Sequence, residues 1–242
     1  MRALVIIPTL NEAESLEKTV RRLRAVCKDD VLIVDDSSAD GTQQIAVKLA
    51  ASLGGINLLE RETSTGLGDA YRAGFEWALQ RGYELVVEMD ADGSHPAEAL
   101  PTMLEISRKT GVALVLGSRW VGGGSVVGWG AIRTLISRAG NAYAKFVLGS
   151  GVNDLTAGFR VVRCDFLKRI GIRTLTASGY CFQIELANRI EKAGGEIIEH
   201  PIVFSEREAG KSKMSSAIVL EALWLVTGWG FSRWFRLARP NA

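Results

Sequence analysis

The sequence predicts an α/β fold built on a doubly wound, mostly parallel sheet, and three observations support this prediction. Short apolar runs, each long enough for one buried strand, alternate with segments of helical periodicity. Turn-forming polar residues follow several of these runs. The 242 residues, 47% of them hydrophobic, can bury the core of one large domain. Strands separated by helices of this length favour parallel pairing through right-handed crossovers.

The predicted elements follow one another in a regular order. Strands are expected at residues 3–7, 31–34, 56–59, 85–89 and 112–116. Between the first two, Leu16, Val20 and Leu23 share one face of a predicted helix. Asn11 and Glu14, three residues apart, have the spacing of a capping box, so we expect them to begin that helix.

Three further helices complete the alternation. Ile45, Leu49 and Leu53 align on the second predicted helix, and residues 68–81 and 96–109 form the third and fourth. No internal repeat or low-complexity linker interrupts the pattern.

The most informative segment is the end of the fourth predicted strand, where Asp90-Ala91-Asp92 is followed by the turn residues Gly93 and Pro96. Ligands bind at the carboxyl ends of strands in open α/β sheets. Two neighbouring carboxylates repel each other unless a positive group lies between them, and Mg²⁺ or Mn²⁺ with substrate phosphates would satisfy both. An ordinary acidic turn that caps the next helix is the alternative interpretation.

Charge is unevenly distributed along the chain, although the net charge is only +2. Residues 1–105 carry 10 basic and 18 acidic side chains (10 − 18 = −8), whereas residues 106–242 carry 19 and 9 (19 − 9 = +10). Residues 106–153 contain no acidic residue. This asymmetry indicates an anionic partner for the second half, whether nucleic acid, anionic lipid or a phosphorylated substrate; a solvated basic face is the alternative.

Several classes are disfavoured. The three cysteines, Cys27, Cys164 and Cys181, show no paired spacing, which argues against a disulfide framework or zinc site and fits a reducing cytoplasm. The first apolar run is too short for a signal peptide. Neither a Gly-x-Gly-x-x-Gly motif after the first strand nor a P-loop motif is present, which disfavours dinucleotide oxidoreductases and P-loop enzymes.

Several motifs, taken in order, resemble those of family 2 glycosyltransferases with the GT-A fold, and more narrowly dolichyl (polyprenyl) phosphate mannose synthases. The motifs lie at residues 5–12, 34–42, 66–74, 89–96, 117–119, 133–137, 154–160, 179–182 and 207–213. The resemblance covers about residues 3–214, and it implies a catalytic domain at residues 1–213.

The resemblance also implies roles for individual residues. The guanosine of GDP-mannose would be surrounded by Pro8, Leu10, Glu12, Val34 and Asp36. The ribose, diphosphate and a divalent metal (Mg²⁺ or Mn²⁺) would meet Asp90, Ala91 and Asp92, with Asp92 as the principal ligand and Ser94 beside it. The donor diphosphate would be held by Arg207 and Lys213, and the phosphate of the lipid acceptor by Arg119, Arg133 and Ser137.

Three positions depart from the family pattern. Leu10 replaces a common aromatic, which would weaken base stacking. Ser94 replaces a frequent glutamine of the metal shell, so water or diphosphate oxygen would complete it. Cys181 stands where some members carry a lysine, which removes one positive contact to the donor.

The implied chemistry suits the residues present. Expulsion of GDP builds negative charge that a divalent ion and basic side chains stabilise. Polyprenyl phosphate is already anionic, so it needs orientation rather than a base, and His95 and His200 are expected to be structural. Attack opposite the leaving group inverts the sugar and gives a β-linked mannosyl phosphate.

Residues 214–242 form a separate C-terminal amphipathic segment in this interpretation. Leu220, Trp224, Phe231 and Phe235 are near helical spacing, but only residues 222–232 are free of charge, about half of a membrane span. We expect an interfacial helix at the cytoplasmic face of the membrane, with the protein peripheral. A core helix, or docking onto a membrane-protein partner, is the alternative.

Two other functions are compatible with parts of the sequence. A related enzyme could transfer glucose or another hexose from a UDP-sugar to the same class of lipid. A nucleic-acid-binding module could use residues 106–153, but the few aromatics there and the unexplained Asp90-Ala91-Asp92 segment argue against it, so no nucleic-acid partner is expected.

Overall fold

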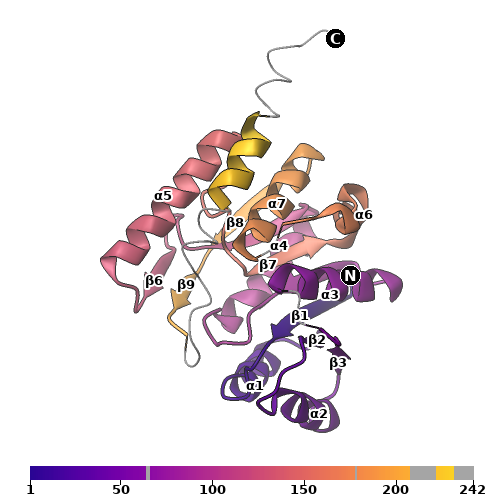
Figure 1. Cartoon of the computed structure of the whole chain (residues 1–242). Helices are drawn as coiled ribbons and strands as arrows, with labels where there is room; N and C mark the ends of the chain where they lie inside the picture. Colours follow the sequence, from indigo (N-terminus) through magenta and orange to yellow (C-terminus); the bar gives the residue numbers. More distant parts are fainter. Residues whose placement is uncertain (64–65, 178, 208–221, 232–242) are drawn as a thin grey trace.

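The computed structural model describes residues 1–63, 66–177, 179–207 and 222–231, and within them a seven-stranded sheet forms the centre of the molecule (Figure 1). The strand order is β3-β2-β1-β4-β7-β5-β8. The strands of this sheet are β1 (Ala3–Thr9), β2 (Asp30–Asp35), β3 (Ile56–Glu60), β4 (Leu85–Glu88), β5 (Leu114–Ser118), β7 (Arg160–Arg163) and β8 (Ile197–Pro201).

The sheet is mostly parallel, as predicted. β1 pairs in parallel with β2 and β4, β2 with β3, and β5 with β8. β7 runs antiparallel to both of its neighbours, β4 and β5. All five strands expected from the sequence are present, with boundaries shifted by one or two residues at most ends.

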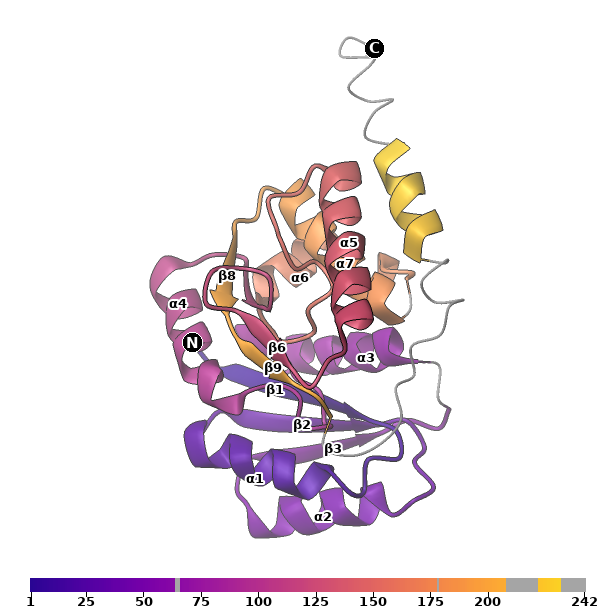
Figure 2. The same ribbon diagram turned by 90° about the vertical axis from the view of Figure 1, so that its left-hand side faces the viewer.

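Helices cover both faces of the sheet, which makes it doubly wound. They are α1 (Leu16–Val26), α2 (Thr42–Ser52), α3 (Leu67–Gln80), α4 (Leu100–Thr110), α5 (Ala131–Leu148), α6 (Cys164–Ile170) and α7 (Gly179–Lys192), with short 3-10 turns at Ala97–Ala99 and Ile172–Thr174. Apolar residues of α1, α2 and α4 pack on one face, and those of α3, α5, α6 and α7 on the other. Figure 2 shows α1 and α2 beneath β1–β3 and α3 on the opposite side.

The predicted capping box at the first helix is wrong. α1 begins at Leu16, after Ser15, and its first turn has no side-chain cap. Asn11 instead adopts a left-handed conformation with φ 57°. Its side-chain oxygen accepts the backbone N–H of Ala39 at 2.9 Å, and its own N–H donates to Ser38 Oγ at 2.9 Å. Asn11 therefore joins the loop after β1 to the loop after β2 instead of starting the helix.

A helix at residues 222–231 lies beside α5 (Figures 1 and 2). Val226 is buried in the same core cluster as α5, and Tyr143 and Thr227 share a hydrogen bond of 2.6 Å. Trp224 on the same helix is 83% exposed. This part of the C-terminal segment thus has both a core face and an exposed apolar side. The predicted boundary after residue 213 and the rest of the segment lie outside the described residues.

A two-stranded parallel sheet, β6 (Ser125–Val127) with β9 (Val203–Ser205), projects beyond the main sheet near the start of α5 (Figure 1). Among the helices that the structure describes, none is long and apolar enough to cross a membrane.

Candidate active site

The polar segments predicted from the sequence meet at one edge of the main sheet. β1, β2 and β4 are parallel neighbours, so the loops that follow them leave from the same side. Pro8 lies opposite Val34 at the ends of β1 and β2, and the N–H of Asp36 donates to Thr9 O at 2.9 Å. Of the five residues expected around a nucleoside, Pro8, Val34 and Asp36 are therefore placed side by side by strand pairing.

Leu10 and Glu12 belong to the loop that continues from β1 into this region. The N–H of Glu12 donates to Thr42 Oγ1 at 2.9 Å, and its carboxylate accepts Ser15 Oγ–H at 2.9 Å. Both residues are half-buried. These bonds hold the loop against the start of α2.

The two aspartates at the end of β2, Asp35 and Asp36, have different contacts. Asp35 is fully buried, and its carboxylate accepts hydrogen bonds from Thr9, Ser38 and Gln43, which fixes the loop. Asp36 instead forms an ion pair with Arg61, the residue after β3. Asp35 is thus structural, whereas Asp36 remains a candidate for ligand contact.

The turn at Asp90-Ala91-Asp92 is rigidly held by its neighbours. Ala91 O accepts Thr19 Oγ1–H at 2.8 Å, and Asp92 Oδ1 accepts the Ser94 N–H at 3.0 Å. The N–H of Asp90 donates to His95 Nδ1 at 3.0 Å. These bonds come from α1 and from the residues after the turn, so both carboxylates have defined positions at the end of β4.

His95 orients Asp90, as well as packing in the core. Because its Nδ1 accepts a hydrogen bond, the proton of the neutral ring is on Nε2, which faces Asp90 Oδ2 at 3.8 Å. The ring stacks on Phe159 with centroids 5.1 Å apart. The expected structural role is supported, and the side chain that it positions belongs to the site.

The electrostatics of the turn favour a positive ligand. Burial raises the pKa of the Asp90 carboxyl and the nearby Asp92 carboxylate raises it further, while His95 and Arg207 act in the opposite direction. Asp92 is 4% exposed, and its Oδ2 forms an ion pair with Arg207 Nε at 3.1 Å. A cationic side chain therefore already offsets part of this negative charge.

The donor set suits a divalent ion shared with a substrate. Among the described residues, no group of three or more His, Cys, Asp and Glu side chains could enclose a metal. Asp90 and Asp92 supply two carboxylates, and the buried Ser94 Oγ has no hydrogen-bond partner among the residues that the structure describes. Mg²⁺ and Mn²⁺ take oxygen ligands, and Mg²⁺ usually retains substrate phosphates and water beside one or two carboxylates. The residues present fit such a metal.

Arg119, which follows β5, is buried in a cage of polar and aromatic side chains. Its Nε and Nη2 donate to the Asp154 carboxylate at 2.7 and 2.6 Å, and Nη2 also donates to Thr156 Oγ1 at 2.9 Å. The rings of Trp120, Trp129 and Phe204 lie 5.4–5.6 Å from its guanidinium carbon. The bidentate pair with Asp154 fixes Arg119 and neutralises much of its charge.

Arg133 and Ser137 lie one turn apart on α5, as predicted. The guanidinium of Arg133 stacks on Trp129 at 4.0 Å from the ring centroid, and Nη1 lies 3.5 Å from Glu206 Oε1. Ser137 O accepts the side-chain amide of Asn141 at 3.0 Å. Because Arg119 and Arg133 both contact the indole of Trp129, the structure places these two predicted acceptor residues next to the same ring.

Residues 106–153 do not form one uniformly basic face. Arg108 pairs with Asp29, Lys109 with Glu105, and Arg119 with Asp154. With the ion pair between Arg133 and Glu206, four of the six basic residues in the acid-free stretch are matched by carboxylates from outside it. This arrangement weakens the interpretation of the stretch as a nucleic-acid-binding surface.

The end of β9 connects the two halves of the site. Glu206 approaches Arg133, and the next residue, Arg207, binds Asp92. The Ser205 N–H donates to Ser94 O at 3.2 Å, and the Glu206 N–H donates to Val127 O at 3.0 Å. A single segment thus contacts both the aspartate turn and the cationic side. Lys213, predicted to act with Arg207, lies outside the described residues.

A buried carboxyl and a buried guanidinium lie on neighbouring strands, two residues before the aspartate turn. Glu88 of β4 is opposite Arg160 of β7, and both are fully buried. Burial raises the pKa of the Glu88 carboxyl to about 7, although Arg160 opposes this shift. Arg160 donates to the carbonyls of Ala157, Gln183 and Leu155 at 2.6–2.7 Å. The Gln183 amide also favours the charged form of Glu88, but no hydrogen bond reaches either carboxylate oxygen from the described residues.

Sequence reasoning assigned no role to several residues that build the site. Asp154 has a recognisable signal, since it is the first acidic residue after the acid-free stretch. Trp129 and Glu206 have no such signal in the sequence, because a single tryptophan or glutamate in a loop can have many different structural roles. Cys181, noted for replacing a lysine, is 1% exposed at the start of α7, and neither it nor the other cysteines form a disulfide.

A family model and two relatives of known name assign the chain to the same family. Residues 4–171 match the model of the glycosyl transferase family 2. An undecaprenyl-phosphate mannosyltransferase of Micrococcus luteus is 50% identical over 236 residues, which cover 97% of this chain and 96% of that protein. A polyprenol monophosphomannose synthase of Mycolicibacterium smegmatis is 45% identical over 231 residues, covering 95% of this chain and 87% of that protein.

Solved structures support the fold. A glucosyl-3-phosphoglycerate synthase from Mycobacterium tuberculosis, in complex with Mn²⁺, UDP and glucosyl-3-phosphoglycerate, superposes with a TM-score of 0.68 at 19% identity, covering 94% of this chain and 80% of that one. The same enzyme in complex with Mg²⁺ and UDP gives a TM-score of 0.68 at 20% identity, covering 94% and 79% of the two chains.

Proposed function

The chain belongs to glycosyl transferase family 2, and on that premise we propose that it transfers mannose from GDP-mannose to a polyprenyl phosphate, with inversion at the anomeric carbon. The product would be a polyprenyl phosphate β-mannose. The two relatives at 50% and 45% identity, which are named for mannosyl transfer to polyprenyl lipids, support the sugar and the acceptor class.

The structural observation that carries the proposal is the position of Glu206 and Arg207. Adjacent in the chain, they contact Arg133 and Asp92 respectively. A group held by Asp92 and an anion held beside Arg133 would therefore both lie next to this one segment. Such proximity is what direct transfer between a nucleotide sugar and a phosphate acceptor requires.

The donor half would bind the nucleotide and stabilise the leaving group. Pro8, Leu10, Glu12, Val34 and Asp36 would surround the guanosine. Asp90 and Asp92 would hold a divalent metal, which when bound neutralises charge on the departing diphosphate. Arg207 would act on the same diphosphate, because its guanidinium already faces the aspartate turn.

The acceptor half would orient the nucleophile. A phosphate monoester is anionic near neutral pH, so its oxygen can attack without a base. Arg133 offers a planar guanidinium on α5, and Ser137 offers a hydroxyl one turn later on the same helix. Arg119 would be a second cation, since it contacts the same Trp129 ring as Arg133. Attack from this side, opposite the GDP held by the aspartate turn, inverts the anomeric carbon.

A lipid acceptor places the reaction at a membrane, and we place the protein on its cytoplasmic face. Exposed apolar side chains on α5 support contact with a membrane, because Ile132, Leu135 and Phe146 are 76%, 68% and 74% exposed. Docking onto a membrane-protein partner is the competing arrangement.

One experiment separates the proposed donor from the UDP-sugar alternative. The protein is incubated with Mn²⁺, undecaprenyl phosphate and either GDP-[¹⁴C]mannose or UDP-[¹⁴C]glucose, and label entering the organic phase is counted. Thermal-shift measurements with GDP, UDP and the two sugar nucleotides run in parallel. Label should move only from GDP-mannose, and GDP should stabilise the protein more than UDP. Transfer from UDP-glucose alone would establish the alternative.

A further inference from the structure

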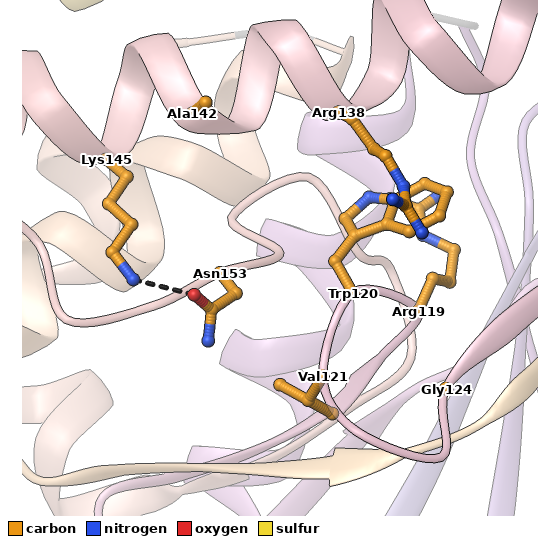
Figure 3. A pocket seen from close by; sticks show the side chains of 8 residues that line it. All are labelled: Arg119, Trp120, Val121, Gly124, Arg138, Ala142, Lys145 and Asn153. Carbon is orange, nitrogen blue, oxygen red and sulfur yellow. Dashed lines mark hydrogen bonds between the residues drawn. The ribbon is translucent and has the colours of Figure 1, made fainter.

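We propose that a cavity between α5 and the loop after β5 binds the phosphate of an anionic membrane phospholipid, as a second anion site beside that of the acceptor. The cavity has a volume of about 280 Å³. At about 30 Å³ per water molecule, it has room for a phosphate group and several waters. Figure 3 shows Arg138 reaching from the helix toward the loop that carries Arg119 and Trp120, and Lys145 reaching from the same helix toward Asn153.

The lining of this cavity is cationic. It contains Arg119, Arg138 and Lys145 and no carboxylate. Asp154 already neutralises Arg119, so the other two residues supply the excess charge. Anionic ligands are attracted to a partly enclosed pocket of one sign, because its low-dielectric walls focus the field.

Arg138 is the residue best prepared for an anion. Within the described part of the chain, its guanidinium has no hydrogen bond or ion pair, and it stacks on Trp120 at 4.8 Å from the ring centroid. Stacking orients the planar guanidinium and leaves its N–H groups available for the two oxygens of a phosphate.

Lys145 lies two turns further along α5 and completes the cationic wall. Its ammonium donates to Gly151 O at 3.2 Å and to Asn153 Oδ1 at 2.6 Å, so one of its three N–H groups is left for a ligand. Glu191 and Glu199, the carboxylates near this loop, accept backbone N–H groups of Gly151 and Asn153. Lys145 is therefore held in place by neutral oxygens and keeps its full charge.

Of the three predicted acceptor-phosphate residues, the cavity shares only Arg119, whose charge is already paired with Asp154. Arg133 and Ser137 do not line it. Arg138 follows Arg133 by five residues, which places it roughly 140° further round the helix. Arg133 faces Trp129 and Glu206, whereas Arg138 faces Trp120. Two anions can thus be bound on different flanks of α5.

An exposed apolar row next to the cavity identifies the source of the phosphate as a lipid. Leu135 precedes Arg138 by three residues, and Phe146 follows Ala142 of the cavity wall by four, so the row and the cavity share an edge of the helix. Leu135 and Phe146 are 68% and 74% exposed. An apolar helix face bordered by cations is typical of a helix lying at an anionic membrane surface.

Vesicle flotation without any sugar nucleotide tests this proposal independently of transfer activity. The wild-type chain is compared with Arg138→Gln, Arg138→Lys and Lys48→Gln on vesicles of phosphatidylcholine, with or without phosphatidylglycerol. Lys48 is an exposed cation on α2, which packs on the opposite face of the sheet, so it controls for the loss of one charge. Arg138 is exposed, and its replacement should leave the fold intact, which is checked by thermal unfolding.

The proposal expects phosphatidylglycerol to increase wild-type flotation, and Arg138→Gln to weaken that binding at least fivefold while Lys48→Gln changes it less than twofold. Arg138→Lys should recover only part, because the charge remains and the planar fork is lost. Millimolar glycerol 3-phosphate should compete with the vesicles for the wild type. If Arg138→Lys bound the vesicles as well as wild type, only the charge of Arg138 would matter and not its planar guanidinium, which would overturn the proposal.

A calorimetric titration distinguishes the lipid from a free phosphate. Glycerol 3-phosphate should bind the wild type weakly and Arg138→Gln not at all, whereas phosphatidylglycerol vesicles should bind the wild type much more tightly. Equal affinity for glycerol 3-phosphate and for the vesicles would contradict a lipid ligand. Failure of mannose transfer by the wild type would refute the proposed function but leave this result unchanged.

Discussion

Arg207 binds the carboxylate of Asp92, with Nε 3.1 Å from Oδ2. Asp92 is the residue expected to be the principal metal ligand, so the same oxygen has two potential cationic partners. If Asp92 binds a divalent ion, Arg207 would be free to turn to the donor diphosphate. Arg207 would then compete with the metal before the donor binds and contact the donor afterwards.

Replacing Arg207 should therefore have opposite effects on two affinities. Arg207→Ala should strengthen Mn²⁺ binding in the absence of nucleotide, because Asp92 loses a competing cation. It should weaken GDP-mannose binding at saturating Mn²⁺ by roughly 10-fold, since a charge-assisted hydrogen bond contributes about 1.5–3 kcal/mol. Isothermal calorimetry measures both. Arg173→Ala, which removes an exposed arginine paired with Glu76, is the control and should change neither. Weaker Mn²⁺ binding by Arg207→Ala would show that Arg207 supports the metal site.

Arg133 should affect the acceptor and not the donor. Arg133→Ala should raise the acceptor KM by about 10-fold or more and lower kcat, because the attacking phosphate loses an orienting fork. Donor affinity measured without acceptor should stay within twofold of wild type. Arg133→Lys should recover only part of the loss. If Arg133→Ala abolished GDP-mannose binding, the acceptor phosphate would have to be assigned to other residues.

Glu88 should make stability fall as pH rises. Burial raises the pKa of its carboxyl from 4.5 to about 7 in the folded protein, so the folded state retains a proton that the unfolded state has lost between these values. The contribution of this protonated carboxyl to the free energy of unfolding is fully present below pH 4.5 and is lost as pH rises through about 7. The loss is on the order of 3 kcal/mol. Glu88→Gln removes the titration, so its free energy of unfolding, measured with urea at pH 5.5 and 8, should decline less than that of wild type. Parallel declines would contradict the assignment.

Substitutions on the two faces of the helix at residues 222–231 should have different effects, one on stability and the other on vesicle binding. Val226 is 2% exposed and packs in the core, whereas Trp224 is 83% exposed. Val226→Ala should lower the free energy of unfolding by about 1–2 kcal/mol with little effect on vesicle binding. Trp224→Ser should leave stability within about 0.5 kcal/mol and reduce vesicle binding. A stability loss from Trp224→Ser as large as that from Val226→Ala would favour the interpretation of this helix as purely core.

The strand positions and the aspartate turn could be predicted because they depend on local patterns. A continuous apolar run such as residues 85–89 specifies a buried strand, and the two carboxylates that follow indicate a ligand-binding edge. The capping-box prediction failed for a physical reason. Asn11 adopts a left-handed conformation and bonds with Ser38 and Ala39, so contacts between loops override its local helix signal.

The long-range parts of the site could not be read from the chain. The pair between Arg119 and Asp154 joins residues 35 apart, and Glu206 and Arg207 reach Arg133 and Asp92 across more than 70 positions. No periodicity encodes such contacts, because they depend on how β7 and β8 insert into the sheet. The family resemblance supplied the roles of Arg119, Arg133 and Arg207, but not the residues that hold them.

The central claim is tested most directly by product analysis after incubation of the protein with GDP-mannose, undecaprenyl phosphate and Mn²⁺. GDP and a lipid-linked mannosyl phosphate should form in equal amounts, and nuclear magnetic resonance should show a β linkage. Asp92→Asn, in which the side chain can still accept the Ser94 N–H, should remain folded but lose most of this product, as should wild type in excess chelator. An α-linked product, free mannose in place of the lipid, or full turnover by Asp92→Asn would contradict the account.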